Sequence, residues 1–550
     1  MRPGFQFRAA ALPTLGVCLA LLSSGCGGRT TSTVPAKPAQ PSVTLTAAQD
    51  TITTGSPTTL TWTSANANTV SLDNGIGDVA PNGSLQVKPA TSTIFHATAS
   101  GSGGVAVASA AVTVVGLPTI QFSANPQTVA SGEPSTLTWS TANATSVFIE
   151  GLGTFAPADS AKVKPLITKT YNAVATGPTA ATATASVTVK VATPDGTSSP
   201  ISRLIVVIMQ NNSFDHLFGM FPAPPGATID GIRPGVPGYS QLNSAGVTVT
   251  PFLLSNPDPA PLPEGHNPYV AVLDGGAMDK FAFYNGDVAM GYYDETIPGI
   301  HTLWNYAREL ALADRYFGSV IGEAPTNQLY LVAASDNGQW FEVQPFFGPC
   351  QLPDVGAQPY TFPNVADQLA AKGISWASFD EGYGDCTVYN PVHEAFQYFV
   401  STHDSKNLQD FSGFATQVQN GTLPAVSFVI PRAAHDMHPG NGPISNGINF
   451  LDGLIQTVQS SPIWNNAAII ITFDTGGGWY DHVPPPAADD QGLNFRVPTL
   501  LISPWAKKGY ISHVVMDHVS ILTFIQWNWG LPSLNQRNTA AGDLRDMFSF

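Results

Sequence analysis

The hydrophobic and polar positions of the chain follow two patterns, and the change between them falls near residue 200. Between residues 42 and 191, apolar and polar positions alternate and threonine and valine are frequent. Turn residues recur there about every eight to twelve positions. After residue 201, short continuous apolar runs alternate with longer segments of helical periodicity. The first pattern predicts antiparallel β-sandwiches, and the second predicts a doubly wound α/β domain.

The β-rich part contains an internal repeat. The segment TTLTWTSANANTVSL at residues 58–72 returns as STLTWSTANATSVFI at residues 135–149. The repeat aligns Trp62 with Trp139, and we expect each tryptophan to lie in the core of one sandwich. The two domains expected, 42–116 and 117–191, resemble bacterial immunoglobulin-like surface modules. A spacer role is favoured over carbohydrate or cell-wall binding, because neither repeat carries a catalytic cluster.

The α/β part, residues 201–550, follows a linker at 192–200 that is rich in Pro, Gly and Ser. The apolar runs predict strands at 204–209, 425–430, 467–473 and 498–502, and the helical segments are 302–313, 365–372, 450–459 and 519–527. Ligands of open α/β sheets bind beyond the carboxyl ends of the strands. Residues that directly follow these strands are therefore the first site candidates.

The strongest of these candidates is Asp474, which follows the strand at 467–473 and precedes three glycines. Gln210 and Asn211 directly follow the first strand, and His438 follows the strand at 425–430. The alternative is a purely structural role, in which Asp474 caps a turn and His482 packs on the loop. A lone histidine such as His266, in EGHNPY, is by itself more often structural than catalytic.

A polar turn at residues 322–327 runs into a predicted helix. Helix N-termini favour anions, so this turn is a candidate for holding a phosphate group.

The N-terminus reads as a targeting segment. Two arginines precede an apolar run at residues 9–22, and Ser-Ser-Gly stands directly before Cys26. The interpretation is a signal peptide over residues 1–26 with a lipoprotein-type box, lipidation of Cys26 and a flexible tether over 27–41. The alternative is ordinary cleavage without lipid. We therefore expect an exported protein, anchored in the cell envelope through its lipid or otherwise secreted.

Charge and cysteine content limit the partners further. The formal net charge of −16 argues against a nucleic-acid partner, because a phosphate backbone would be repelled. Of the four cysteines, Cys18 leaves with the signal peptide and Cys26 is the lipidation site. The remaining pair, Cys350 and Cys386, is expected to form a disulfide in an oxidising compartment.

Several longer motifs of residues 201–550 stand in a fixed order: MQNNSFDHLFGMFP, GGAMDKFAFYNG, MGYYDETIPGIHTLWNYA and TFDTGGGWYDHVPPP. With FRVPTLLISPWAKKGYISHVVMDHVSILTFIQW, they resemble the bacterial phosphoesterase family of phospholipases C and acid phosphatases. The resemblance implies an alkaline-phosphatase-like α/β/α fold. It also implies hydrolysis of phosphoric esters by a hydroxyl nucleophile, with a divalent metal ion held mainly by carboxylates.

The metal positions of the family are only partly kept. Asn211 and Asp474 match the family, but Gln210 replaces a metal-binding glutamate and Thr475 replaces a second acid. The resemblance thus implies a metal site of Gln210, Asn211 and Asp474 with a single carboxylate. Because a hard divalent ion prefers anionic oxygen ligands, metal affinity is expected to be weak or lost.

The catalytic positions are also altered. The nucleophile position aligns with Ala324, and Thr326 would substitute for it if the turn is rearranged by two residues. His266, His438 and His482 match the histidines of the family's site. We expect the metal and histidine positions to surround one cleft at the sheet edge. For an active hydrolase, the expected substrate is a phospholipid or a small phosphomonoester. The alternative to an active hydrolase is a catalytically impaired protein that binds ligands at the cell surface.

Overall fold

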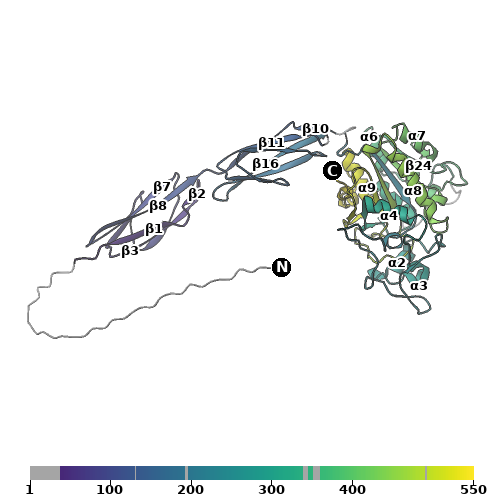
Figure 1. Ribbon diagram of the computed structural model, residues 1–550, viewed down its shortest axis with the longest axis horizontal. Coiled ribbons are helices and arrows are strands. Elements are labelled where there is room, and N and C mark those ends of the chain that lie inside the picture. Colours follow the sequence, from purple (N-terminus) through teal and green to yellow (C-terminus); the bar gives the residue numbers. More distant parts are fainter. Residues whose placement is uncertain (1–36, 131, 193–195, 339–344, 351–358, 490–491) are drawn as a thin grey trace, which may run out of the picture. The chain divides into compact units, whose positions relative to one another are not determined.

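The computed structural model describes residues 37–550 except 131, 193–195, 339–344, 351–358 and 490–491. Two β-rich modules are followed along the chain by an α/β domain (Figure 1). The expected signal peptide, the lipidation site Cys26 and most of the tether lie outside the described residues. Within the described residues, no helix has the length and apolarity needed to span a bilayer.

The first β-rich module consists of two sheets around one core. A three-stranded sheet has the order β1-β3-β6 and a five-stranded sheet the order β2-β8-β7-β4-β5. The strands are β1 (Ser42–Ala47), β2 (Thr51–Thr53), β3 (Thr58–Ala65), β4 (Thr69–Leu72), β5 (Gly77–Val79), β6 (Gly83–Val87), β7 (Thr93–Gly101) and β8 (Gly104–Val115). Trp62 from one sheet and Phe95 from the other belong to the same hydrophobic cluster. The alternating pattern therefore buries one face of each sheet against the other.

The second module repeats this strand order. Its sheets run β9-β11-β14 and β10-β16-β15-β12-β13, which is the order of the first module with every strand number raised by eight. The strands are β9 (Thr119–Asn125), β10 (Thr128–Ala130), β11 (Ser135–Ala142), β12 (Ser146–Ile149), β13 (Gly153–Phe155), β14 (Asp159–Val163), β15 (Lys169–Thr176) and β16 (Thr182–Ala192). Trp62 and Trp139 are both buried, and their indole N–H groups donate to the carbonyls of Ala80 and Ala156. The predicted repeat and its buried tryptophans are confirmed.

The α/β domain is built on an eight-stranded sheet of order β25-β24-β26-β17-β27-β28-β22-β29. Its strands are β17 (Arg203–Met209), β22 (Ala311–Ala313), β24 (Trp376–Asp380), β25 (Leu408–Asp410), β26 (Val426–Ile430), β27 (Ala467–Phe473), β28 (Thr499–Ile502) and β29 (Tyr510–Ser512). Strands β25, β24, β26, β17 and β27 are mutually parallel, and β28 is antiparallel to its neighbours. All residues of β26 and β27 are buried, as expected for a sheet that is covered on both faces.

Two groups of helices pack on this core. Helix α8 contacts both α4 and α7, and α5, α6, α9 and α10 form a second group. The helices are α1 (Phe214–Phe218), α2 (His266–Leu273), α3 (Phe281–Asn285), α4 (Ile300–Glu309), α5 (Ala324–Ala333), α6 (Val365–Ala371), α7 (Phe414–Gln419), α8 (Ile444–Gln459), α9 (His518–Trp529) and α10 (Gln536–Ala540). Short strand pairs, β18 (Gln241–Leu242) with β19 (Thr248–Val249), β20 (Phe252–Leu253) with β21 (Gly291–Tyr292) and β23 (Tyr316–Phe317) with β30 (Met516–Asp517), lie outside the main sheet.

The four strands predicted in this domain are present, but one predicted helix is too long. The helix predicted over 302–313 ends at Glu309, and Ala311–Ala313 forms strand β22 between β28 and β29. The alanine-rich run has no clear periodicity, so its pairing with β28 decides its conformation. Strand β24, which sequence reasoning missed, is the one that brings Asp380 to the sheet edge.

The second half of the predicted linker is part of the α/β domain. Thr197, Ser199 and Pro200 are buried. The Ser199 hydroxyl donates to Oδ1 of Asn528 at 2.6 Å, and the Ser198 N–H donates to the Asn528 carbonyl at 2.7 Å. The described segment from Thr197 onward is thus attached to the end of α9.

The two cysteines of the α/β domain are joined. Cys350 and Cys386 form a disulfide with a Cα–Cα distance of 5.1 Å. The bond closes a loop over 36 residues of the sequence, which includes α6 and β24.

Candidate functional site

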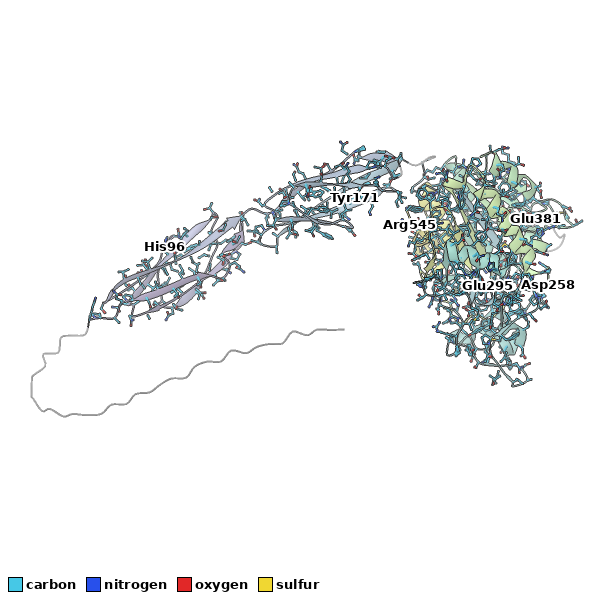
Figure 2. All side chains as sticks on the ribbon, viewed as in Figure 1. His96, Tyr171, Asp258, Glu295, Glu381 and Arg545 are labelled. Atoms are coloured by element: carbon cyan, nitrogen blue, oxygen red, sulfur yellow. A yellow bond between two sulfur atoms is a disulfide. The ribbon has the colours of Figure 1, made fainter. Side chains whose placement is uncertain are left out.

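A polar cleft of about 430 Å³ lies at the carboxyl ends of three adjacent parallel strands, β24, β26 and β17. It is lined by Gln210, Asn211, Glu264, Glu323, Ala324, Pro325, Asp380, Glu381, Val388, Tyr389, Asn390, His393, Ile430, Pro431, Arg432, Ala433, Asp436, His438 and Asn441. The labelled Glu381 marks its β24 side in Figure 2. The sheet edge predicted from the strand pattern is therefore hollowed, and Gln210, Asn211 and His438 lie on its wall.

Asn211 and Asp474 are in direct contact at this edge. The backbone N–H of Asn211 donates to Oδ1 of Asp474 at 3.0 Å, and the same oxygen accepts the N–H of Thr475 at 2.6 Å. Asn211 has a positive φ of 55°, which asparagine tolerates better than most residues. A Cβ on Gly477 would lie 2.3 Å from the Asn211 carbonyl oxygen, so the chain can turn back here only because that residue is glycine.

Burial changes the protonation of Asp474. The side chain is fully buried, and this burial raises the pKa of its carboxyl to about 7, although the N–H groups of Asn211 and Thr475 oppose the shift. The other carboxylate oxygen has only a long contact of 3.5 Å with Nε2 of Gln328. Near neutral pH, Asp474 is therefore divided between its acid and its anionic form.

Gln210 presents an unsatisfied group to the cleft. Its backbone N–H donates to the Asp436 carbonyl at 2.8 Å, which connects the end of β17 to the loop after β26. Its side-chain oxygen Oε1 is buried and has no hydrogen-bond partner among the described residues. A buried carbonyl oxygen without a donor is costly, so this atom is available to a ligand that enters the cleft.

His438 is paired with an acid on the cleft wall. Its Nε2 lies 3.3 Å from Oε1 of Glu264, and its Nδ1 lies 2.7 Å from the Pro439 carbonyl. Burial lowers the pKa of His438, but the contacts with Glu264 and Pro439 outweigh it and raise the pKa to about 9. The imidazole is therefore protonated at neutral pH and carries a positive charge into an otherwise acidic cleft.

The turn before α5 places position 324, and not position 326, at the cleft. Ala324 and Pro325 line the cleft at the first turn of the helix. Thr326 is fully buried, and its hydroxyl donates to the Glu323 carbonyl at 2.7 Å within its own turn. The rearrangement that would present Thr326 to a substrate is not seen, so its position does not support the predicted role as nucleophile.

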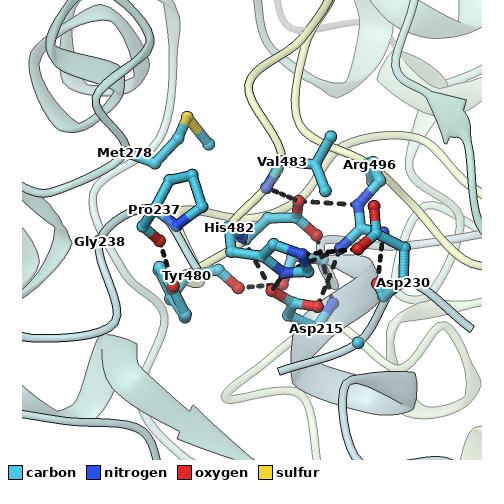
Figure 3. A network of polar contacts seen from close by, with 12 residues as sticks. Asp215, Asp230, Pro237, Gly238, Met278, Tyr480, His482, Val483 and Arg496 are labelled. Atoms are coloured by element: carbon cyan, nitrogen blue, oxygen red, sulfur yellow. Dashed lines mark hydrogen bonds and ion pairs between the residues drawn. The ribbon is translucent and has the colours of Figure 1, made fainter. Parts of the chain in front are cut away.

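The other two histidines do not line the cleft. His266 begins α2, and its Nδ1 lies 2.5 Å from the Ile321 carbonyl, just before the turn that leads into α5. His482 lies in a separate buried network, where Nδ1 is 2.6 Å from Oδ2 of Asp215 and Nε2 is 3.1 Å from Oδ1 of Asp230 (Figure 3). The expectation that His482 faces Gln210 and Asp474 is not met, because Asp215 holds its ring instead.

The network around His482 is a closed set of opposite charges. Arg496 is fully buried and donates to Asp481 at 2.8 Å and to Asp215 at 2.9 Å (Figure 3). Its remaining nitrogen donates to the carbonyls of Asp230 and Asp314. Burial lowers the pKa of His482, but Asp215 and Asp230 outweigh it and raise the pKa to about 9. Each charge has a partner in this network, so the network stabilises the fold.

Comparison with known proteins shows to which family the α/β domain is related. Residues 201–532, more than half of the chain, match the Phosphoesterase family. The chain belongs to the Phosphoesterase family. Phospholipase C B of Mycobacterium tuberculosis is 27% identical over 427 residues, which cover 64% of this chain and 79% of that protein.

Two further relatives of the Phosphoesterase family carry similar names. Non-hemolytic phospholipase C of Pseudomonas aeruginosa is 25% identical over 64% of this chain and 58% of its own length. Non-specific phospholipase C3 of Arabidopsis thaliana is 26% identical over 63% of this chain and 73% of its own length. Among solved structures, the I-band fragment I67–I69 from titin covers 31% of this chain and 72% of that one at 14% identity, but its TM-score of 0.23 supports no inference.

The family's divalent ion does not fit the residues at its expected position. Asp474 is the only acid among the candidate ligands, and its Oδ1 is already occupied by two backbone N–H groups. The side-chain oxygen of Asn211 accepts the Thr475 hydroxyl at 2.7 Å. No group of three or more His, Cys, Asp or Glu side chains within the described residues is arranged to hold a metal ion. We assign no metal ion to Gln210, Asn211 and Asp474.

Sequence reasoning missed two acidic residues of this phosphoesterase cleft, Glu264 and Asp380. Asp436, two residues before His438, also lines the cleft, and burial raises its pKa to about 6. Asp380 has a sequence signal, because it ends a buried run from Trp376 in the same way that Asp474 follows its strand. Glu264 lies in a proline-rich loop, and no local pattern distinguishes it.

Proposed function

We propose that this protein hydrolyses phosphoric esters of the kind that phospholipases C cleave, and that the reaction takes place in the cleft at the ends of β24, β26 and β17. The observation that carries the proposal is the family match over nearly the whole α/β domain. The position of the cleft supports it, because open α/β sheets bind ligands beyond the carboxyl ends of their strands. The relatives named phospholipase C make a phospholipid or small phosphoester the expected substrate.

Two features of the cleft suit a phosphoryl group. Helix α5 begins on its wall, and the N-terminus of a helix stabilises negative charge. The protonated imidazole of His438 adds a full positive charge on the same wall. His438 would stabilise the charge on the phosphoryl oxygens and donate a proton to the departing oxygen of the ester.

The attacking group in this proposal is water. Position 324 carries no hydroxyl, and the Thr326 hydroxyl is occupied within its own turn. Glu264 is the nearest base to His438 on the cleft wall and is placed to accept a proton from an attacking water. The residues at the family position do not fit a divalent ion, so no step of this proposal passes through an ion there.

The second candidate function is ligand binding without turnover. The observation that favours it is Ala324, which leaves the cleft without a side-chain nucleophile at the matching position. Such a protein would keep the polar cleft and bind phosphoesters at the cell surface.

A matched pair of histidines tests the proposal. His435 and His438 both follow β26 and each pairs with a glutamate, Glu381 or Glu264, but only His438 lines the cleft. We expect turnover of p-nitrophenyl phosphate or p-nitrophenylphosphorylcholine by the mature full-length chain to fall at least about 100-fold in His438→Asn and to change little in His435→Asn. Saturable binding of these esters without turnover in the wild type would favour the second candidate. Equal losses in both variants would contradict the placement of the reaction.

The N-terminal part completes the proposal. The identical strand order of the two β-rich modules supports a pair of immunoglobulin-like spacers, and the lipoprotein-type box supports an exported protein that Cys26 anchors in the cell envelope. The α/β domain would have an alkaline-phosphatase-like α/β/α arrangement, as the family resemblance implies. Metabolic labelling with a radioactive fatty acid, lost in Cys26→Ala, tests the anchor.

A further inference from the structure

Two carboxyl groups are buried together at the β24 end of the cleft. Asp380 is the last residue of β24 and is 1% exposed, and it lies on the cleft wall. Glu394 lies between the short 3-10 helices η4 (Pro391–His393) and η5 (Ala395–Tyr398) and is fully buried. The two side chains are within hydrogen-bonding reach of each other, so they form one site.

The oxygen atoms of this pair are not satisfied by the protein. Both carboxylate oxygens of Asp380 and Oε2 of Glu394 are buried without a hydrogen-bond donor among the described residues. The other Glu394 oxygen accepts the Phe396 N–H at 2.9 Å. The hydroxyl of Ser378, also fully buried, lies within hydrogen-bonding reach of Glu394. Within the described residues, no cation is paired with Asp380 or Glu394.

Burial and mutual repulsion make this arrangement costly. Both act to raise the pKa of Asp380, and the charge of the nearby Asp410 adds to the effect. Burial also raises the pKa of Glu394. The acid Glu381 next in sequence is paired with Arg432 and His435, so those two cations are already occupied. Unpaired buried carboxylates are strongly destabilising, so the pair needs a proton or a cation to neutralise it.

We propose that Asp380, Glu394 and Ser378 bind a divalent cation of the oxygen-preferring class, such as Ca²⁺, Mg²⁺ or Mn²⁺. Two carboxylates and a hydroxyl supply hard oxygen donors of the kind these ions use. The cleft next to Asp380 gives the ion an entry path and room for the waters that complete its coordination. The site is separate from the family position, because β26 and β17 lie between β24 and β27, the strand that precedes Asp474.

The cation would also change the charge of the cleft. Acids are the majority of its charged lining residues, and they oppose the approach of a phosphate group. A divalent ion at Asp380 would neutralise the local excess without contacting Asp474. This inference does not depend on the proposed hydrolysis, because a ligand-binding protein would gain in the same way.

Direct binding measurements test the site. Isothermal titration of the metal-free, full-length mature chain with Ca²⁺, Mg²⁺ or Mn²⁺ should give one saturable site for at least one of these ions. Asp380→Asn and Glu394→Gln should each weaken the affinity at least about tenfold, because each removes an anionic ligand. The matched control is Glu381→Gln, which removes a neighbouring acid of the same cleft but not a member of the pair, and it should leave the affinity within about twofold.

Two further measurements keep the test decisive. Circular dichroism and a thermal melt establish that each variant is folded, and Ser378→Ala provides a milder change that should weaken binding without removing a charge. Asp474→Asn should leave the affinity unchanged, and loss of binding in that variant would place the ion at the family position instead. The proposal is overturned if no ion shows saturable binding. It is also overturned if Asp380→Asn and Glu394→Gln bind as the wild type does, in which case a shared proton neutralises the pair.

Discussion

The backbone N–H of Asn211 donates a 3.0 Å hydrogen bond to the carboxylate of Asp474, a residue 263 positions later in the chain. The contact joins the carboxyl ends of the neighbouring parallel strands β17 and β27. It also holds Asn211 in its left-handed conformation beside the cleft. The carboxyl to which the family resemblance assigns metal binding thus fixes the backbone in this structure.

Asp474 should make the protein less stable as the pH rises. Burial raises its pKa from an ordinary value of 3.8 to about 7 in the folded protein, so between these pH values the folded state holds a proton that the unfolded state releases. The free energy of unfolding therefore falls with rising pH, by up to about 4 kcal/mol from this residue. Asp474→Asn keeps an oxygen that accepts both N–H groups. Between pH 4 and pH 8, its free energy of unfolding, measured by urea denaturation, should therefore fall by up to about 4 kcal/mol less than that of the wild type. An unchanged fall would show that Asp474 is ionised in the fold.

His482 should also make the protein less stable as the pH rises, but over a higher pH range. Its pKa is raised from 6.5 to about 9 in the folded protein, so its stabilising contribution is complete below pH 6.5 and is lost as the pH rises through 9. We expect His482→Gln to lower the free energy of unfolding by about 3 kcal/mol at pH 6, with a smaller difference at pH 10. Denaturation curves at the two pH values check this. A difference that grows with pH would contradict the paired, protonated state of the ring.

Removal of Arg496 should be more damaging than removal of His482. Arg496 is fully buried between Asp215 and Asp481, and its loss leaves two buried acids without their main cation. Arg496→Met should cost about 3–5 kcal/mol. Thermal denaturation of this variant beside Arg432→Met, whose side chain is partly exposed, provides the comparison. Similar melting temperatures for the two variants would contradict the structural function assigned to the network.

The disulfide between Cys350 and Cys386 should stabilise the α/β domain. Replacement of both cysteines by serine should cost about 2–4 kcal/mol, because the unfolded chain is no longer cross-linked. Thiol labelling of the unfolded, unreduced protein should leave both cysteines unmodified. Labelling of both would show that the purified protein lacks the bond.

The turn before α5 can be tested with two small substitutions. Thr326→Val removes a buried hydroxyl that bonds only within its turn, so it should cost about 1 kcal/mol of stability and leave phosphoester turnover within about twofold. Ala324→Ser places a hydroxyl on the cleft wall and should raise any hydrolysis that the wild type shows. Loss of turnover in Thr326→Val would instead make Thr326 the nucleophile.

Much of the framework follows from local sequence patterns. Buried strands such as β17 and β27 are continuous apolar runs, and the parallel-sheet rule then brings Asn211 and Asp474 to one edge. The two tryptophans of the repeat could be predicted for a similar reason, since alternation in each module places them on the inner face. These features depend on residues close in sequence to the element that they define.

The composition of the cleft depends on contacts that no local pattern records. His482 and Asp481 follow the glycine turn as predicted, but Asp215 and Arg496 come from distant segments and hold them away from the cleft. The Asp380–Glu394 pair forms only because the chain after β24 returns through η4 to the end of the same strand. The family resemblance identifies Ala324 as the nucleophile position. Only the structure shows why Thr326 does not take over this position: its hydroxyl donates to the Glu323 carbonyl.

The attachment of residues 197–200 to Asn528 has a mechanical consequence. Any tension that reaches the α/β domain along the chain from its N-terminal side first loads the hydrogen bonds of Ser198 and Ser199 with the end of α9. Strand β17, which ends at the cleft, lies behind this attachment. Force applied from the N-terminal side would therefore have to break the bonds of Ser198 and Ser199 with the end of α9 before it reached β17 and the cleft.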